Sequence, residues 1–359
     1  FSVPYSEFYN ERRDYASSLN YTRRLFASDE MPLDDKLTYF DRITGDRNFY
    51  STFYLQINDL ATTLAMKYPH DPRVVKLYGD HLIASGQLDD ALTYYKTHLD
   101  DLPPRIDYFN MVIDIESYKQ RPDSVEHYTS RAMKLFPENV DLHLRKGQML
   151  SYAKRYDEAL KFYKNSLRLA PGDSLRGAVW GIIGETYHLM GQQALQKQSE
   201  DRRPKASLYE SRKGPAARCM RKCYDAYDRS LGYWRDNALV LNNYAYFLSI
   251  EGRDLERALE MATRVMATSE KNPTYLDTYA WVLYRLGRLD EAKQAIQQAV
   301  AFDEHGNPEL FAHYGDILNA LGDRFSAEFY WQKALDAGYD AAEIRRRMES
   351  TPSAEKPAR

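Results

Sequence analysis

The sequence predicts an all-α fold, a right-handed α-solenoid of stacked helix–turn–helix repeats, and three observations lead to it. Residues 275–300 contain two patterns of apolar and small residues at helical spacing, separated by a short turn at Gly287. Small residues equivalent to Ala292 in this stretch return at a regular period elsewhere in the chain. Each such unit buries one face and leaves another uncovered, so it needs neighbouring units.

Local signals define the two helices of this unit. Gly287 ends the first helix, because glycine adopts the left-handed C-cap conformation without steric cost. Asp290 and Glu291 open the second helix, where carboxylates are favoured by the positive end of the helix dipole. Ala292 and Ala299 are small, which lets the two helices approach closely. We therefore expect a tight helical hairpin.

The period of the pattern is close to 34 residues. Ala258 and Ala292 are 34 residues apart, and Ala292 and Ala327 are 35 apart. Ala91 and Ala159 are separated by 68 residues, which leaves room for one degenerate copy at 105–137. A second small residue lies about 12 positions before each of these alanines, and this set is Gly79, Gly147, Ala245, Ala280 and Gly315.

A period of 34 with small residues at these places resembles the tetratricopeptide repeat, and the resemblance covers residues 71–340. The alternative is a helical bundle without repeats, and five units in register argue against it. The resemblance implies about seven helix pairs in an interaction scaffold.

The two ends of the chain differ from the repeats. Residues 1–70 lack the small-residue positions and are predicted to be a divergent helical segment, with helices at 33–43 and 48–68 after a partial repeat or an extended arm. Residues 341–359 are predicted to form a capping helix, starting near Tyr339, and a disordered tail. The chain begins at Phe1 without methionine, so we expect that an upstream segment was removed or left out.

One insertion interrupts the repeats. Ala159 and Ala258 are 99 residues apart, and the excess falls at 191–214, between helices expected at 174–190 and 215–233. The insertion is basic, and its candidate contact residues are Arg202, Arg203, Lys205, Arg212 and Lys213. It is interpreted either as a solvated loop or helix extension, or as a surface for an acidic or phosphate-bearing partner.

Composition narrows the function classes. The formal net charge is −3, which gives no global field for nucleic acid or an anionic membrane. The 30 tyrosines fill gaps between helices or line a groove. Cys219 and Cys223 are four residues apart without further ligands nearby, so they are interpreted as two partly buried thiols. No run of 18 apolar residues is present that would predict a membrane span.

The C-terminal half carries a closer resemblance. Residues 241–261, 272–293 and 313–323 resemble blocks found in this order in exported or lipoprotein tetratricopeptide-repeat proteins of Bacteroidetes-type bacteria. This resemblance implies a periplasmic or outer-membrane-associated protein, with a lipid anchor outside residues 1–359. A cytoplasmic location is the alternative.

The sequence carries no recognisable motif for chemistry. It has no HExxH, GxSxG, GxGxxG or GxxxxGK[ST] pattern, and its eight histidines are scattered. His313 and Asp316, one helical turn apart, are interpreted as a structural or groove-facing pair. We therefore predict no catalytic residue, no metal site and no cofactor, and a protein that is not an enzyme.

The first helices of the repeats are expected to line a concave groove. From the alanine register, the candidate partner-binding residues are Asn242, Tyr246, Asp277, Trp281, Tyr284, Arg285, Asp316 and Asn319. The aromatic members would provide contact area, and the polar ones hydrogen bonds to an extended peptide or its charged ends. In the alternative interpretation, Trp281 packs between repeats. Asp80 stands where a carboxylate clamp containing Lys76 would need asparagine, which argues against recognition of a C-terminal carboxylate.

The sequence thus predicts a scaffold that binds a protein or peptide partner, and no nucleic acid, in the concave groove. One alternative is an assembly factor that self-associates or binds through its convex face or basic insertion. The other is a non-catalytic accessory subunit of an envelope enzyme.

Overall fold

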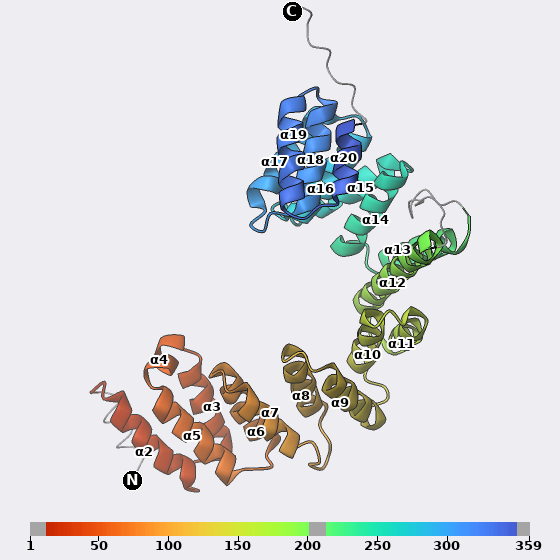
Figure 1. The fold of residues 1–359 in the computed structure, drawn as a ribbon. Helices are drawn as coiled ribbons and strands as arrows, with labels where there is room; N and C mark the ends of the chain where they lie inside the picture. The colour runs from red at the N-terminus through yellow and green to blue at the C-terminus, as the bar shows by residue number, and fades with distance from the viewer. Residues whose placement is uncertain (1–11, 201–212, 350–359) are drawn as a thin grey trace, which may run out of the picture. The chain divides into compact units, whose positions relative to one another are not determined.

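A computed structural model describes residues 12–200 and 213–349 of the chain (Figure 1). Every regular element in these residues is a helix. The predicted fold class, an all-α solenoid of helix–turn–helix repeats, is confirmed. The chain forms two compact units, one ending at Leu142 and the other beginning at His143, and each is described by itself.

In the described part of the first unit, four helices precede the regular repeats. They are α2 (Tyr15–Ala27), α3 (Leu33–Thr44), α4 (Arg47–Thr52) and α5 (Tyr54–Lys67). The regular pairs are α6 (Pro72–Ala84) with α7 (Leu88–Thr97), and α8 (Ile106–Tyr118) with α9 (Pro122–Leu135). Helix α10 (Val140–Tyr152) begins at the end of this unit.

The described part of the N-terminal segment is helical and differs from the sequence prediction in one helix. Residues 15–27 form a full helix, α2, that packs against α5. The helix expected at 48–68 is divided at Phe53 into α4 and α5. The rings of Phe49 and Phe53 both pack against the ring of Tyr15.

Lys36, which is fully buried, donates hydrogen bonds to the carbonyl oxygens of Phe26 (2.9 Å) and Ser28 (2.7 Å). This lysine satisfies carbonyls at the C-terminal end of α2 and ties α2 to α3.

The second unit continues the pairs. After α10 come α11 (Tyr156–Leu169), α12 (Asp173–Glu200), α13 (Pro215–Tyr233), α14 (Ala238–Glu251), α15 (Leu255–Met266), α16 (Pro273–Arg285), α17 (Leu289–Phe302), α18 (Pro308–Ala320), α19 (Arg324–Asp336) and α20 (Ala341–Glu349). Within this unit the first helices pack on one another, α14 on α16 and α16 on α18. The last helix, α20, packs on α19 at the position where the sequence predicts a cap.

The recurring small residue before each repeat alanine has a steric cause. A Cβ atom built on three of these glycines would lie 2.2–2.4 Å from an aromatic ring of the following helix. The pairs are Gly79 with Tyr95, Gly147 with Tyr163, and Gly315 with Trp331. In the repeats with alanine at this position, Ala245 and Ala280, the residue at the same spacing is aliphatic, Met261 or Ile296.

The turn at Gly287 has the expected geometry. Gly287 adopts a φ of +77°, and the amide of Arg288 donates to the carbonyl oxygen of Leu283 at 3.0 Å. This is the left-handed C-cap that a residue with a side chain adopts only at a steric cost.

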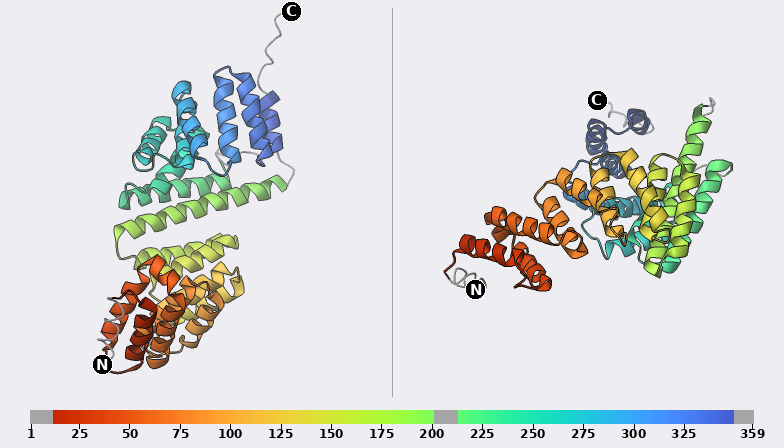
Figure 2. Two further views of the ribbon diagram at one scale, coloured as in Figure 1. Left: turned by 90° about the vertical axis from the view of Figure 1, so that its left-hand side faces the viewer. Right: turned by 90° about the horizontal axis from the view of Figure 1, so that it is seen from below.

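Part of the insertion is helical. Helix α12 continues through residues 191–200 as the longest helix of the second unit and lies beside α13 (Figure 2). Ala194 and Leu195 extend its apolar side onto the core formed by α13, α14 and α15. Lys213 lies in the bend before α13 and is exposed. Four predicted contact residues lie outside the described residues, namely Arg202, Arg203, Lys205 and Arg212.

Candidate functional site

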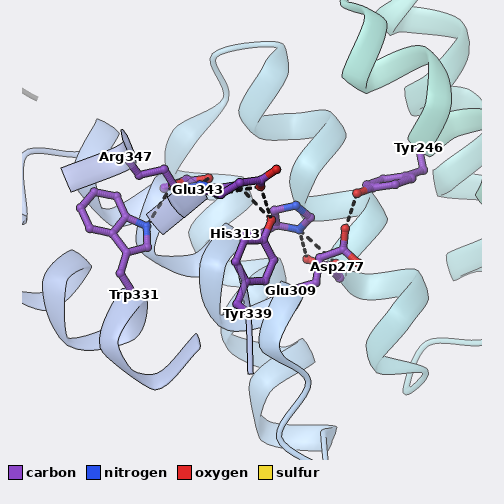
Figure 3. A network of polar contacts seen from close by, with 9 residues as sticks. Tyr246, Asp277, Glu309, His313, Trp331, Tyr339, Glu343 and Arg347 are labelled. Carbon is purple, nitrogen blue, oxygen red and sulfur yellow. Dashed lines mark hydrogen bonds and ion pairs between the residues drawn. The ribbon is translucent and has the colours of Figure 1, made fainter. Parts of the chain in front are cut away.

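The predicted groove residues belong to the first helices of the last three repeats, α14, α16 and α18. Five of them lie in one continuous set of contacts across these helices: Tyr246, Asp277, Trp281, Tyr284 and Asp316. We call the side of the second unit that these five residues form the inner face. Figure 3 shows its polar contacts.

A buried ion pair lies at the centre of the inner face. Asp277 on α16 and His313 on α18 are 8% and 3% exposed. Nδ1 of His313 is 2.9 Å from Oδ1 and 3.1 Å from Oδ2 of Asp277 (Figure 3). Burial acts to lower the pKa of His313, but the Asp277 carboxylate outweighs it, with smaller contributions from Glu309 and Asp316, so the pKa is raised above 6.5. The Asp277 carboxylate therefore favours the protonated form of His313.

An aromatic stack covers this ion pair. The Trp281 ring lies on the His313 ring with centroids 4.0 Å apart, and Tyr284 lies on Trp281 at 4.8 Å. Trp281 and Tyr284 are partly exposed. The indole Nε1 of Trp281 is buried and has no hydrogen-bond partner among the described residues. An unsatisfied buried donor costs about 1–3 kcal/mol, so this stack carries a local energetic deficit.

One contact on the inner face joins side chains that are two repeats apart. The hydroxyl of Tyr246 on α14 donates a hydrogen bond to Glu309 on α18 (Figure 3). This contact links the first helices α14 and α18 within the second unit.

The capping helix completes the polar network. Arg347 of α20 donates to Oδ2 of Asp316 at 2.9 Å, and Nε1 of Trp331 donates to Oδ1 at 3.0 Å. Burial raises the pKa of Asp316, and the attraction of Arg347 opposes this without reversing it. Tyr339 and Glu343 both contact Arg347 (Figure 3). Both oxygens of the Asp316 carboxylate are thus hydrogen-bonded to side chains of the protein itself.

The remaining three predicted residues have local roles. Asn242 is 6% exposed, and its amide reaches Oδ1 of Asn243 at 3.4 Å. Arg285 donates to the carbonyl oxygen of Ile250 at the end of α14, at 3.1 Å. Asn319 accepts a long contact of 3.5 Å from Arg324.

Sequence reasoning missed several partners in this network. It paired His313 with Asp316, one turn away on the same helix, whereas the structure pairs His313 with Asp277 of the preceding repeat. Glu309 and Arg347 were not considered. The signal that could have found Asp277 is its spacing of 36 residues from His313, since residues about one repeat apart on first helices become neighbours.

A hollow lies where α12 continues past the usual repeat length. It has a volume of about 430 Å³ and is lined by Lys154, Tyr156, Leu189, Gln192, Gln193, Gln196 and Lys197. This lining contains two lysines and no carboxylate. The hollow places some of the positive charge predicted for the insertion beside α11.

Comparison with known proteins agrees with this fold. The tetratricopeptide repeat family model matches residues 120–174 and 274–305. A TPR repeat-containing protein of Pseudomonas aeruginosa is 30% identical over 81 residues, which are 23% of this chain and 13% of that protein. This chain therefore matches only a small part of that relative's length.

Two solved structures have a similar fold. The Cut9–Hcn1 hetero-tetramer of the APC/C has a TM-score of 0.51 at 13% identity, over 95% of this chain and 59% of that chain. PilW, described as a type IV pilus biogenesis factor, has a TM-score of 0.50 at 15% identity, over 67% of this chain and 97% of that chain.

The repeats, the packing of their helices and the family matches define the class of the protein. This chain is a tetratricopeptide-repeat protein, as its sequence predicts. Its repeats support a role as a protein-interaction scaffold, and the family is typically non-catalytic. Among the described residues, no helix combines the length and apolar character required to cross a bilayer.

Proposed function

We propose that this protein is a non-catalytic scaffold that binds an extended segment of a partner protein on the inner face of α14, α16 and α18. The observation that carries the proposal is the aromatic stack of Trp281 and Tyr284, partly exposed on the inner face, with an indole N–H that has no acceptor among the described residues. A small rotation of the indole would let this N–H donate to a peptide carbonyl, which would remove the deficit of about 1–3 kcal/mol. Partly exposed aromatic rings on a protein surface are common centres of binding energy.

The charges of the inner face suggest what kind of segment it binds. Asp277 is compensated by His313, and Asp316 by Arg347. Because these charges are paired inside the protein, we expect recognition of an uncharged, extended stretch through backbone hydrogen bonds and apolar side chains. This mode differs from a carboxylate clamp, which needs free positive charge. Lys76 and Asp80 likewise form an ion pair with each other.

The proposed location is the bacterial envelope. Its support is the resemblance of residues 241–323 to exported tetratricopeptide-repeat proteins. A lipid anchor outside residues 1–359 belongs to the same proposal. Cells that express the full-length protein can be fractionated, and protease can be added to the intact cells. Recovery of all of the protein in the cytosolic fraction, protected from the protease, would contradict this location.

Site-specific photo-crosslinking tests the inner face directly. A benzophenone amino acid replaces Tyr284 in living cells of the source organism, and the matched control places it at Tyr152, an 88% exposed tyrosine on α10. We expect a discrete adduct from position 284 that disappears when Trp281→Phe is added, because phenylalanine keeps an aromatic ring and removes the indole N–H. Circular dichroism of each variant checks that helicity is retained.

Other outcomes separate the competing functions. A third benzophenone placed at Lys213 reports on the insertion, whose hollow contains Lys154 and Lys197. Adducts from position 213 but not from 284 would reject the inner face and favour a partner at the basic insertion. A dominant adduct of this protein with itself would favour the assembly role.

A further inference from the structure

A cluster of potential metal ligands lies in the first unit, far along the sequence from the inner face. It joins the loop before α6 to the loop after α7 and consists of His70, His98 and Asp101. One ligand atom of each residue lies within 4.8 Å of the others. Sequence reasoning found no metal spacing, because His70 and His98 are 28 residues apart and meet only when the two helices of the repeat pack.

His98 is held in a fixed orientation. It is 8% exposed, and its Nδ1 lies 2.9 Å from the carbonyl oxygen of Tyr94 in the last turn of α7. Its Nε2 lies 2.9 Å from the carbonyl oxygen of Pro69. An Nδ1–H that donates to the Tyr94 carbonyl fixes the tautomer, and Nε2 can then coordinate a metal once it leaves the Pro69 carbonyl.

The surroundings favour a cation. The cluster lies at the C-terminal end of α7, where the helix dipole is negative. Oδ1 of Asp101 is 3.3 Å from Nδ1 of His70. Oδ2 of Asp101 and the hydroxyl of Tyr94 are buried, and neither has a hydrogen-bond partner among the described residues. A buried carboxylate oxygen without a donor is costly, and a bound cation would remove this cost.

We propose that His70, His98 and Asp101 bind one divalent transition-metal ion, with zinc as the favoured metal. Two imidazole nitrogens and one carboxylate oxygen are a donor set that zinc accepts, and water completes the tetrahedron. Magnesium and calcium prefer oxygen ligands and are expected to bind weakly. The metal would pin the two ends of one repeat, the turn before α6 and the loop after α7, to each other.

Binding requires a modest rearrangement. Ligand atoms about 2.1 Å from a tetrahedral zinc are about 3.4 Å apart, so the cluster must contract from its present spread. The side chain of His70 is 77% exposed and can move without disturbing the core. Nε2 of His98 gives up its contact with Pro69, while the bond from Nδ1 to Tyr94 is kept.

The test is metal titration of the full chain purified without a histidine tag. Isothermal titration with ZnCl₂ should show one saturable equivalent, and zinc should raise the melting temperature until EDTA is added. MgCl₂ should do neither. His70→Ala and Asp101→Asn should each weaken zinc binding at least about tenfold. The matched control His305→Ala, which removes another exposed histidine, should bind like the wild type.

Two results would overturn the proposal. One is the lack of saturable zinc binding by the wild type at about one equivalent. The other is unchanged binding by His70→Ala, which would assign the metal to other groups, such as the thiols of Cys219 and Cys223. His70 is exposed, so its removal should leave the fold intact, and matching circular dichroism spectra of the metal-free proteins check this.

Discussion

The pKa of His313 is raised in a place where burial alone would lower it. Its imidazole is enclosed by the Trp281 ring on one side and by the Asp277 carboxylate at its edge. Desolvation disfavours the imidazolium, and the close Asp277 carboxylate is the largest influence that favours it. This ion pair joins the first helices of two neighbouring repeats on the inner face.

This pair predicts a pH dependence of stability. Because the pKa of His313 in the folded protein is above its usual 6.5, the pair contributes fully below pH 6.5, and the contribution is lost as pH rises through the folded pKa. Asp277→Asn should lower stability by about 3–5 kcal/mol at acidic pH, the cost of breaking a buried pair. The melting temperatures of the variant and the wild type should then converge as the pH is raised.

Thermal unfolding between pH 5.5 and pH 9 measures this effect. Asp290→Asn, at an exposed carboxylate on α17, is the control and should follow the wild type at every pH. A gap between Asp277→Asn and the wild type that stays constant or widens with pH would show that His313 is not charged in the folded protein.

At the scale of the helix pair, the absence of a side chain on glycine lets the two helices approach closely. Glycine in the first helix leaves space for an aromatic ring from the second, as Gly147 does for Tyr163. Glycine lowers the intrinsic stability of a helix by about 0.5–1 kcal/mol relative to alanine. The pairing offsets this cost through the burial of Tyr163, which is 1% exposed.

Substitution of this glycine should therefore be harmful although alanine favours helices. In Gly147→Ala the new methyl carbon would lie 2.4 Å from the Tyr163 ring, and we expect a loss of about 1–3 kcal/mol from overpacking. The control is Gly232→Ala on α13, where no atom lies within 4 Å, and it should be neutral or slightly stabilising. Equal melting temperatures for the two variants would contradict the steric explanation.

At the scale of the whole molecule, stability is distributed over two compact units, and the division falls within α10. Repeat proteins are held together by contacts between neighbouring repeats, so a unit with its own core can fold without distant repeats. The second unit has such a core, which continues from α13 to the capping helix α20.

A fragment of residues 137–359, which keeps all of α10, should therefore fold alone. We expect helicity per residue close to that of the full chain, a cooperative thermal transition, and the same adduct from the benzophenone at position 284. A fragment that melts without a transition would show that the second unit needs the first. If the fragment gives the same adduct, the proposed binding activity belongs to the second unit.

The sequence by itself determined the parts of this protein that repeat. The alanine period predicted the helix pairs of the solenoid, and Gly287 predicted a left-handed C-cap that the structure contains. These features were predictable because they depend on local conformation and on helical periodicity, and both are determined by residues close together in the sequence.

The tertiary structure alone decided which side chains meet. The ion pair of Asp277 with His313, the contact of Tyr246 with Glu309, and the approach of His70 to His98 join residues that are 28–63 positions apart. Residue types show that such groups can interact, but their distances depend on how each repeat rotates onto the next. Curvature and rotation arise from the summed packing of many side chains, so no local pattern in the sequence encodes them.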